Sequence, residues 1–294
     1  MKRYIRSDLA CEAGCDLSKI EGTEYEKTVS EVCTIESLTV KTEVAATVLG
    51  HAKGTYVTLT SEKLWLMSEE TLDEFSDIIS NALRKMICKI CGKSKLSQNA
   101  SILVVGLGNR SITADALGPQ AVDLLNVTRH LKEYDPSLFF DLGTCTVSAL
   151  TPGVMGKTGI ESAEIIHSAV KTVSPDAVIA IDALAAGSVE RLATTVQISD
   201  AGISPGAGIG NLRTEISKEA LGVPVIALGI PTVVDSATLI SDTLIKADIT
   251  ELSDESLARL EGHWGFYVTP KETDIIAERS ARLLTNAINK ALVI

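Results

Sequence analysis

The stretch "ILVVGLGNRSITADALGP", residues 102–119, begins as an apolar run typical of a buried strand and then turns through Gly106 and Gly108. A glycine pair after a strand opens the fingerprint of dinucleotide-binding folds, whose third glycine would stand at Ser111. That glycine is missing, and the carboxylate of Asp115 near the start of the next helix would repel a pyrophosphate, so nucleotide binding is disfavoured. The motif therefore raises the question of what Asp115 does.

Apolar runs of the same kind recur through the second half of the chain. Short continuous strands are predicted over residues 176–182, 194–199 and 223–229, and the segments 159–173 and 236–247 have helical spacing. Strands buried on both faces that alternate with helices indicate a mainly parallel sheet with helices on both sides. The sequence therefore predicts a three-layer α/β core.

The first hundred residues follow a different pattern. Residues 33–44 and 54–60 alternate between apolar and polar side chains and are rich in Val and Thr, which is typical of antiparallel strands with one face in water. A capping serine, early acids and helical spacing predict a helix over residues 68–87, and a last helix is expected at 271–292. The N-terminal part is therefore expected to be rich in β-structure.

Composition limits the classes of protein that fit. The chain has 294 residues, of which 45% are hydrophobic, so it can bury a sizeable core. We expect a β-rich layer with one helix at residues 9–100, packed on an α/β core at residues 101–294. A net charge of −11 without clustered Lys and Arg makes nucleic acid an unexpected partner. No signal-peptide core or membrane-length apolar run is present, and six cysteines fit reduced thiols, so we expect a cytoplasmic protein without a membrane partner.

Three candidate functional features fall at the carboxyl ends of predicted strands, where open α/β sheets bind their ligands. Asp115 follows the strand that ends near Gly106, Asp182 ends the run "AVIAID", and a glycine-rich loop with Gly206 and Gly208 follows "TTVQIS". A charge at the end of an apolar strand lowers stability unless it is paired, hydrated or functional. The loop could bind substrate through its backbone amides, or its glycines could simply allow a tight turn.

The two aspartates allow more than one chemistry. If they lie close together, repulsion keeps one carboxyl protonated while the other, ionised, activates a water that attacks a carbonyl group. The same pair could hold a divalent metal, for which His130 is the nearest candidate third ligand. Asp115 could instead only cap the following helix. Spacing alone leaves the metal-free and metal-dependent chemistries open.

Several segments together resemble the germination proteases of endospore-forming bacteria. They are "VVGLGN" (104–109), "TADALGP" (113–119), "TRHL" (128–131), "TPGVMGKTGIES" (151–162), "VIAIDALA" (178–185), "TVQISDAGISPGAGIGN" (195–211), "LGVPVIALGIPTVVD" (221–235) and "VTPKETD" (268–274). The resemblance implies an endopeptidase of the spore core that begins the degradation of small acid-soluble spore proteins at germination. It also implies a homotetramer without a cofactor, made as a zymogen with a short N-terminal propeptide.

The resemblance assigns the family's two essential aspartates to Asp115 and Asp182, which makes them a catalytic dyad. The family in turn resembles hydrogenase-maturation endopeptidases, which share the glycine-asparagine loop and whose acids bind nickel. Their fold is thereby implied, and a metal-dependent peptidase remains an alternative. Ala114 departs from the family pattern, which usually has proline before the acid and therefore a stiffer turn. A non-catalytic module that binds a spore protein in the same cleft is the alternative of another class.

A processing site is predicted near the N-terminus. Family substrates are cut after an acid in a Thr-Glu-apolar-Ala context, and Ser7, Asp8, Leu9 and Ala10 have the same order of residue types. We therefore expect self-cleavage between Asp8 and Leu9, which removes residues 1–8 as the propeptide.

An enzyme that cuts after acids needs a cation or a set of backbone donors for the acidic side chain. Arg129 and Arg191 each follow a matched segment, so both are candidates for substrate binding. Surface arginines are more often solvated or held in weak ion pairs, which is the alternative for each.

Overall fold

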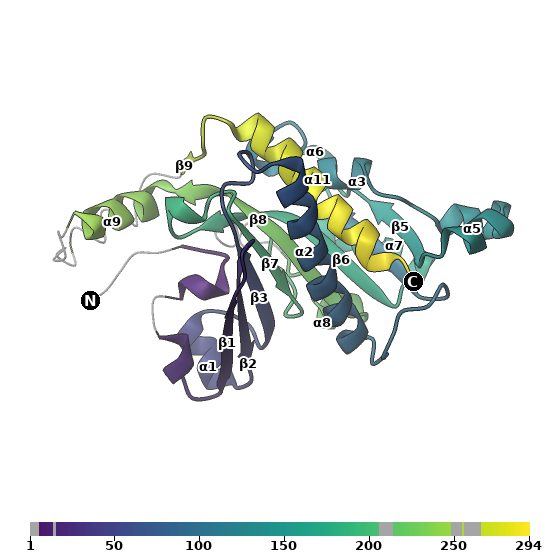
Figure 1. Ribbon diagram of the computed structural model, residues 1–294, viewed down its shortest axis with the longest axis horizontal. Helices are drawn as coiled ribbons and strands as arrows, with labels where there is room; N and C mark the ends of the chain where they lie inside the picture. The colour runs from purple at the N-terminus through teal and green to yellow at the C-terminus, as the bar shows by residue number, and fades with distance from the viewer. Residues whose placement is uncertain (1–5, 14–15, 206–213, 248–254, 256–265) are drawn as a thin grey trace.

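The computed structural model describes residues 6–13, 16–205, 214–247, 255 and 266–294 (Figure 1). Within them the strands form one open sheet in the order β1-β2-β3-β7-β8-β6-β4-β5, and β9 pairs with β8. The strands are β1 (Thr23–Val29), β2 (Thr34–Val40), β3 (Gly54–Thr60), β4 (Ser101–Gly106), β5 (Thr146–Leu150), β6 (Ala177–Ala186), β7 (Thr195–Ser199), β8 (Val225–Asp235) and β9 (Tyr267–Val268).

The helices lie mostly between strands of the second half. They are α1 (Glu43–Leu49), α2 (Glu69–Ile90), α3 (Leu117–Asp123), α4 (Arg129–Tyr134), α5 (Pro136–Leu142), α6 (Met155–Thr158), α7 (Ser162–Val173), α8 (Lys218–Leu221), α9 (Ser236–Lys246) and α11 (Thr273–Leu292). Short 3-10 turns are η1 (Ala10–Glu12), η2 (Leu17–Lys19), η3 (Thr113–Asp115) and η4 (Val189–Arg191). Among the helices of the described segments, none combines the length and the apolar composition that crossing a bilayer requires.

The two long helices begin and end close to where their sequence signals predict. Ser68 caps α2, because its hydroxyl accepts a hydrogen bond from the Thr71 amide at 3.0 Å, and Glu69 and Glu70 follow in the first turn. The last helix expected at 271–292 is α11. A difference lies within residues 33–44, where the predicted strand ends at Val40 and α1 begins at Glu43, with Thr42 as its cap.

The sheet is mixed rather than mainly parallel. Strands β5, β4, β6 and β8 are parallel, whereas β1, β2, β3 and β7 pair antiparallel and β7 meets β8 antiparallel. Only residues 187–194 connect β6 to β7, which is too short for the crossover that a parallel strand requires. The N-terminal strands join the same sheet through β3 and β7, so they extend the sheet instead of forming a separate layer.

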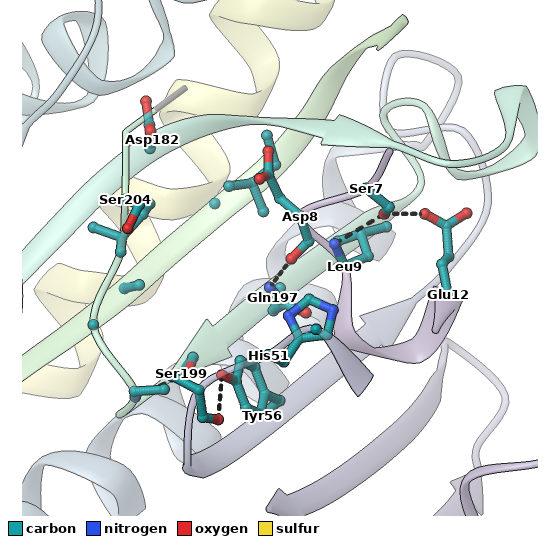
Figure 2. Close-up of a pocket in the computed structure, with 18 of the residues that line it drawn as sticks. Ser7, Asp8, Leu9, Glu12, His51, Tyr56, Asp182, Gln197, Ser199 and Ser204 are labelled. Carbon is teal, nitrogen blue, oxygen red and sulfur yellow. Dashed lines mark hydrogen bonds between the residues drawn. The ribbon is translucent and has the colours of Figure 1, made fainter. Parts of the chain in front are cut away.

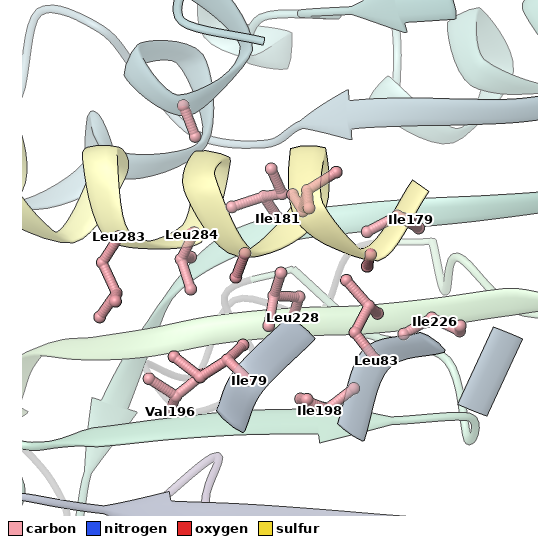
Figure 3. Packing of buried hydrophobic residues seen from close by; sticks show 14 of the residues in the cluster. Ile79, Leu83, Ile179, Ile181, Val196, Ile198, Ile226, Leu228, Leu283 and Leu284 are labelled. Atoms are coloured by element: carbon pink, nitrogen blue, oxygen red, sulfur yellow. The ribbon is translucent and has the colours of Figure 1, made fainter. Parts of the chain in front are cut away.

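Helices cover both faces of the parallel half, as the alternation of strands and helices predicts. On one face α2 and α11 lie side by side and, with α3, bury the largest apolar cluster of the molecule's described part (Figures 1 and 3). On the other face α7 and α8 cover a second cluster that includes Leu103, Val105, Val178 and Ala180. Part of this second face, over β6, β7 and β8, is left to the candidate site.

Candidate functional site

Strand alternation separates the side chains of β6, β7 and β8 onto two faces. On each strand, successive side chains point to opposite faces, so every second residue shares one face. The residues Ile179, Ile181, Val196, Ile198, Ile226 and Leu228 all join the cluster beneath α2 and α11. Residues at the alternate positions line a cavity of about 850 Å³ on the other face, namely Asp182, Leu184, Gln197, Ser199, Ala227 and Gly229.

Three of these residues stand in one row across the sheet. Gly229 of β8 is in register with Asp182 of β6 on one side and with Gln197 of β7 on the other. A Cβ atom at Gly229 would lie 2.6 Å from the Asp182 carbonyl oxygen and 2.6 Å from Cγ of Leu184. Because Gly229 has no side chain, the cavity stays open between Asp182 and Gln197.

Asp182 is buried, with 5% of its surface exposed, and its Oδ1 accepts a hydrogen bond from the Ala183 amide at 2.9 Å. Its strand does not end there, as the sequence suggested, because β6 continues to Ala186. The neighbouring strand β4 ends at Gly106, opposite Ile181, so Asp182 is the first residue of β6 beyond that end. The acid thus lies at the carboxyl end of the parallel pair although it sits within a longer strand.

Asp115 lies in the turn η3 and is half-buried, outside the set of described residues that line the cavity. Its Oδ2 accepts a hydrogen bond from the Asn109 amide at 2.8 Å, so the carboxylate closes the loop that follows β4. The cap position of α3 is Ala116. Gly108 has φ +110°, and a Cβ there would meet the Asp115 carbonyl oxygen at 2.1 Å, so this close turn requires glycine.

The loop after β4 hydrogen-bonds both to the strand that carries Asp182 and to the side chain of Asp115. The Leu107 amide donates to the carbonyl oxygen of Ile181, the residue before Asp182, at 2.8 Å. Two residues later the Asn109 amide donates to Asp115. The structure therefore brings both acids beside the same three-residue stretch, while only Asp182 lines the cavity.

The N-terminal segment, residues 6–12, forms part of the wall of this cavity, which residues 6–9 and Glu12 line (Figure 2). The Asp8 amide donates to the Ala185 carbonyl oxygen at 2.9 Å, and the Ala185 amide donates to Oδ2 of Asp8 at 2.8 Å. Leu9 and Ala10 have no exposed surface. Leu9 packs in a small apolar cluster with Leu184, Ala186, Leu192 and Val234. The segment predicted to contain the processing site is thus held against β6.

Gln197 holds the same segment from β7. Its Nε2 donates to the Asp8 carbonyl oxygen at 2.7 Å (Figure 2). Its Oε1 accepts from the Ala10 amide at 2.8 Å. No role was predicted for this residue from the sequence. Its signal was an amide side chain inside the apolar run "TTVQIS", which a buried strand tolerates only when the amide is hydrogen-bonded.

A hydrogen bond between Ser7 and Glu12 links the two ends of the segment. The Ser7 hydroxyl donates to Oε2 of Glu12, and the Gly187 amide donates to the same oxygen at 2.6 Å. Burial raises the pKa of Glu12, and the hydrogen bonds from Ser7 and Gly187 together with the charge of Arg191 only partly offset this rise. The carboxyl therefore gains a proton more readily than an exposed glutamate does.

His51 and Tyr56 line another wall of the cavity, with ring centroids 5.5 Å apart in an edge-on arrangement. Burial lowers the pKa of His51 and raises that of Tyr56, so both rings are neutral near pH 7. Neither residue was identified from the sequence, where a single histidine after a glycine has no distinguishing pattern.

Neither of the predicted cationic residues is among the described residues that line the cavity. Arg191, in η4, donates from Nη1 to the Thr60 hydroxyl at 2.5 Å, and its Nη2 lies 3.7 Å from Oε2 of Glu36. Arg129 and His130 are exposed at the start of α4, beside the beginning of β5 and therefore at the opposite end of the parallel strands from Asp182.

Two further predictions concern the loop and a metal. Gly206 and Gly208 lie outside the described residues, although Ser204 just before them lines the cavity. Among the residues that the structure describes, no three or more His, Cys, Asp or Glu side chains form a group with metal-binding geometry.

Comparisons with known proteins agree with one family. The model of the germination protease family matches residues 5–249. A germination protease of Clostridium acetobutylicum is 39% identical over 98% of this chain and 95% of its own length. One from Caldanaerobacter subterraneus is 39% identical over 98% of the chain and 94% of its length, and one from Priestia megaterium is 46% identical over 82% and 66%. The chain therefore belongs to the germination protease family and is a peptidase, a hydrolase of peptide bonds.

Proposed function

We propose that this peptidase is an endopeptidase that begins the degradation of small acid-soluble spore proteins at germination and cuts after an acidic residue. One observation carries the proposal. Ser7, Asp8 and Leu9, which together with Ala10 have the residue order of the expected substrates, line the cavity of Asp182, and Asp8 pairs with β6. A substrate strand bound in the same way would add to the sheet through its backbone, as many peptides do on sheet edges.

In this proposal the acidic side chain is received by backbone donors rather than by an arginine. The Ala185 amide already donates to the Asp8 carboxylate at 2.8 Å. A hydrogen bond from a backbone amide to a carboxylate is stronger than one between neutral groups, and it selects an acceptor at this position. The next side chain enters the apolar cluster that now holds Leu9, which accounts for an apolar residue after the acid.

Asp182 and Asp115 form the proposed catalytic dyad. Asp182 lines the cavity and, when ionised, takes a proton from the attacking water, while Asp115 holds the loop beside it through the Asn109 amide. A metal held by the same acids is the runner-up, and chelation distinguishes the two mechanisms.

The N-terminal segment also supports a zymogen. It lines the cavity and hydrogen-bonds to Ala185 of β6, so an external substrate cannot pair with this part of β6 until the segment leaves or is cut. Self-processing between Asp8 and Leu9 removes residues 1–8, frees the acid-binding amide of Ala185 and admits a substrate. We further propose that the active form is a homotetramer in the spore core, without nucleic-acid or membrane partners.

The test is mass spectrometry of the full chain. Intact masses recorded over time should show loss of residues 1–8 in a first-order reaction that survives a chelator. The processed protein should then cleave a peptide with Thr-Glu-Ile-Ala after Glu and leave a matched Thr-Gln-Ile-Ala peptide uncut. Loss of both reactions with chelator would assign the acids to a metal, cleavage of both peptides would remove the acid specificity, and an inert chain would indicate a binding module.

A further inference from the structure

Gln197 contacts the N-terminal segment on both sides of the Asp8–Leu9 bond. Its Nε2 donates to the carbonyl oxygen of Asp8 at 2.7 Å, which is the oxygen of the bond predicted to be cut, and its Oε1 accepts from the Ala10 amide at 2.8 Å. The side-chain amide of Gln197 thus makes the two hydrogen bonds that the backbone N–H and C=O of a neighbouring strand would make. The carbonyl and the amide that flank Leu9 are both held in place.

The surroundings fix this amide in one orientation. Gln197 is 8% exposed, and both of its hydrogen bonds run to the segment. A buried amide whose partners are lost leaves a donor and an acceptor unsatisfied, which destabilises the site. The side chain is therefore arranged to bind an extended peptide, and its burial strengthens a hydrogen bond to a charged acceptor.

The row across the sheet places this amide opposite the acid. Gln197 and Asp182 are each in register with Gly229, so their backbones are two strand spacings apart, about 9–10 Å. Both side chains line the same cavity, and the residue between them has no side chain. The space above Gly229 therefore has a hydrogen-bond donor on one side and a carboxylate on the other.

We propose that Gln197 is a catalytic residue of this peptidase, whose Nε2 donates to the oxygen of the scissile carbonyl and stabilises the negative charge that develops on it. The inference rests on the proposed function, because it takes the Asp8–Leu9 segment as the model of bound substrate. Water adds to the Asp8 carbonyl carbon, one of its protons passes to an ionised aspartate, and the carbonyl oxygen becomes an oxyanion. The carbon–nitrogen bond then breaks, and the proton goes to the Leu9 nitrogen, which leaves as an amine beside a new carboxyl on Asp8.

Gln197 also holds the substrate at a second backbone position, that of Ala10, which is two residues after the acid. Oε1 of Gln197 requires a donor on the backbone at the position of Ala10, so proline cannot be accepted there. A Thr-Glu-Ile-Pro peptide should therefore be cut at least tenfold more slowly than Thr-Glu-Ile-Ala by the processed wild-type protein.

The main test measures self-processing of the full chain by intact mass, because the segment is already bound and the rate reports the chemical step. Gln197→Met removes both polar groups at nearly constant volume, and Gln197→Glu removes the donor but keeps the acceptor. Both should process about 10²–10³-fold more slowly than the wild type, the usual effect of losing an oxyanion donor. The matched control is Thr195→Val on the same face of β7, a buried residue outside the cavity lining, which should process at the wild-type rate.

The pH profile separates a catalytic role from a structural one. In Gln197→Glu the new carboxyl regains a donor when protonated, so its rate relative to the wild type should rise as pH falls, whereas Gln197→Met should show no such recovery. Variants that process within threefold of the wild type would overturn the inference and leave the proposed function intact. If Gln197→Met does not fold, a ratio for Gln197→Glu that is constant with pH overturns it as well. A wild-type chain that cuts neither itself nor the peptide overturns both proposals together.

Discussion

The two faces of the strands β6, β7 and β8 are built from alternating residues of the same short segments and differ in what they do. One face is apolar and closes on α2 and α11 through Ile179, Ile181, Val196, Ile198 and Leu228 (Figure 3). The other carries an acid, an amide and a glycine and opens into the cavity that the N-terminal segment also lines. Neighbouring residues along one strand should therefore affect different properties, stability on one face and cleavage on the other.

The largest expected effect comes from Asp182→Asn. Removing a proposed catalytic carboxylate should slow self-processing on the order of 10⁴-fold. The free energy of unfolding should change little, because asparagine has the same shape and its Oδ1 can still accept from the Ala183 amide. Intact mass and urea unfolding measure the two quantities.

The control for Asp182→Asn is Ile181→Val, the preceding residue on the other face. It should leave cleavage unchanged and lower the free energy of unfolding by about 0.5–1.5 kcal/mol. Equal processing rates in Asp182→Asn and the wild type would contradict the assignment of this acid.

The second prediction concerns Ile198→Ala, which lies next to Gln197 and faces α2. Ile198 has no exposed surface, so truncation leaves a cavity and should lower the free energy of unfolding by about 2–5 kcal/mol. Molecules that remain folded should still process at the wild-type rate. A loss of processing in folded protein would mean that the two faces are coupled through β7 rather than independent.

The architecture of the sheet was predictable only in part. Continuous apolar runs identified β4, β6, β7 and β8, and serine capping with helical spacing identified α2. The sequence did not predict the direction of β7 or that both halves of the chain form one sheet. Strand pairing depends on which edges meet and on the length of the connection at residues 187–194. The pattern of a single strand contains no information on its neighbours.

The candidate site was predictable to a similar extent. Asp182 was identified because a charge within an apolar strand is unusual. Gln197 was not, since its importance arises from its register with Gly229 and from contacts with residues almost 190 positions away. Asp115 and Asp182 both lie beside the loop that follows β4, but of the two only Asp182 lines the cavity. Long-range contacts of this kind cannot be read from local spacing.

The third prediction, Gly229→Ala, tests the boundary between the faces. The added Cβ would lie 2.6 Å from the Asp182 carbonyl oxygen and from Cγ of Leu184, so the strands must shift. Overpacking of this kind should lower the free energy of unfolding by about 1–3 kcal/mol, and processing should slow as well. Gly156→Ala is the control, because a Cβ there meets nothing within 4 Å. If Gly229→Ala changed neither the free energy of unfolding nor the rate of processing, the close packing at this position would not require glycine.

The fourth prediction concerns the pH dependence of the bound segment. Burial raises the pKa of Glu12 above the ordinary value of 4.5, which it regains when the segment leaves the cavity. Its contribution to docking is therefore fully present below pH 4.5 and is lost as pH rises through the higher pKa of the docked state. Protection factors from hydrogen exchange at residues 8–12, which correct for the intrinsic rise of exchange with pH, should fall over that interval in Asp182→Asn, which keeps the segment intact. Adding Glu12→Gln should remove this pH dependence. A dependence that persists in the double variant would belong to another titratable group; the charged neighbours of Glu12 are Arg191 and Asp242.

The smallest effect is expected for Arg129→Ala, and it tests whether a cation is needed to receive the acid. Arg129 is exposed at the end of the parallel strands opposite Asp182, so its loss should change the free energy of unfolding by less than about 0.5 kcal/mol. Self-processing and cleavage of the Thr-Glu-Ile-Ala peptide should both remain at wild-type rates, because the Ala185 amide receives the carboxylate. If peptide cleavage fell while self-processing did not, substrates would have to extend well beyond the stretch that the N-terminal segment occupies, and the cavity face would be only one part of the binding surface.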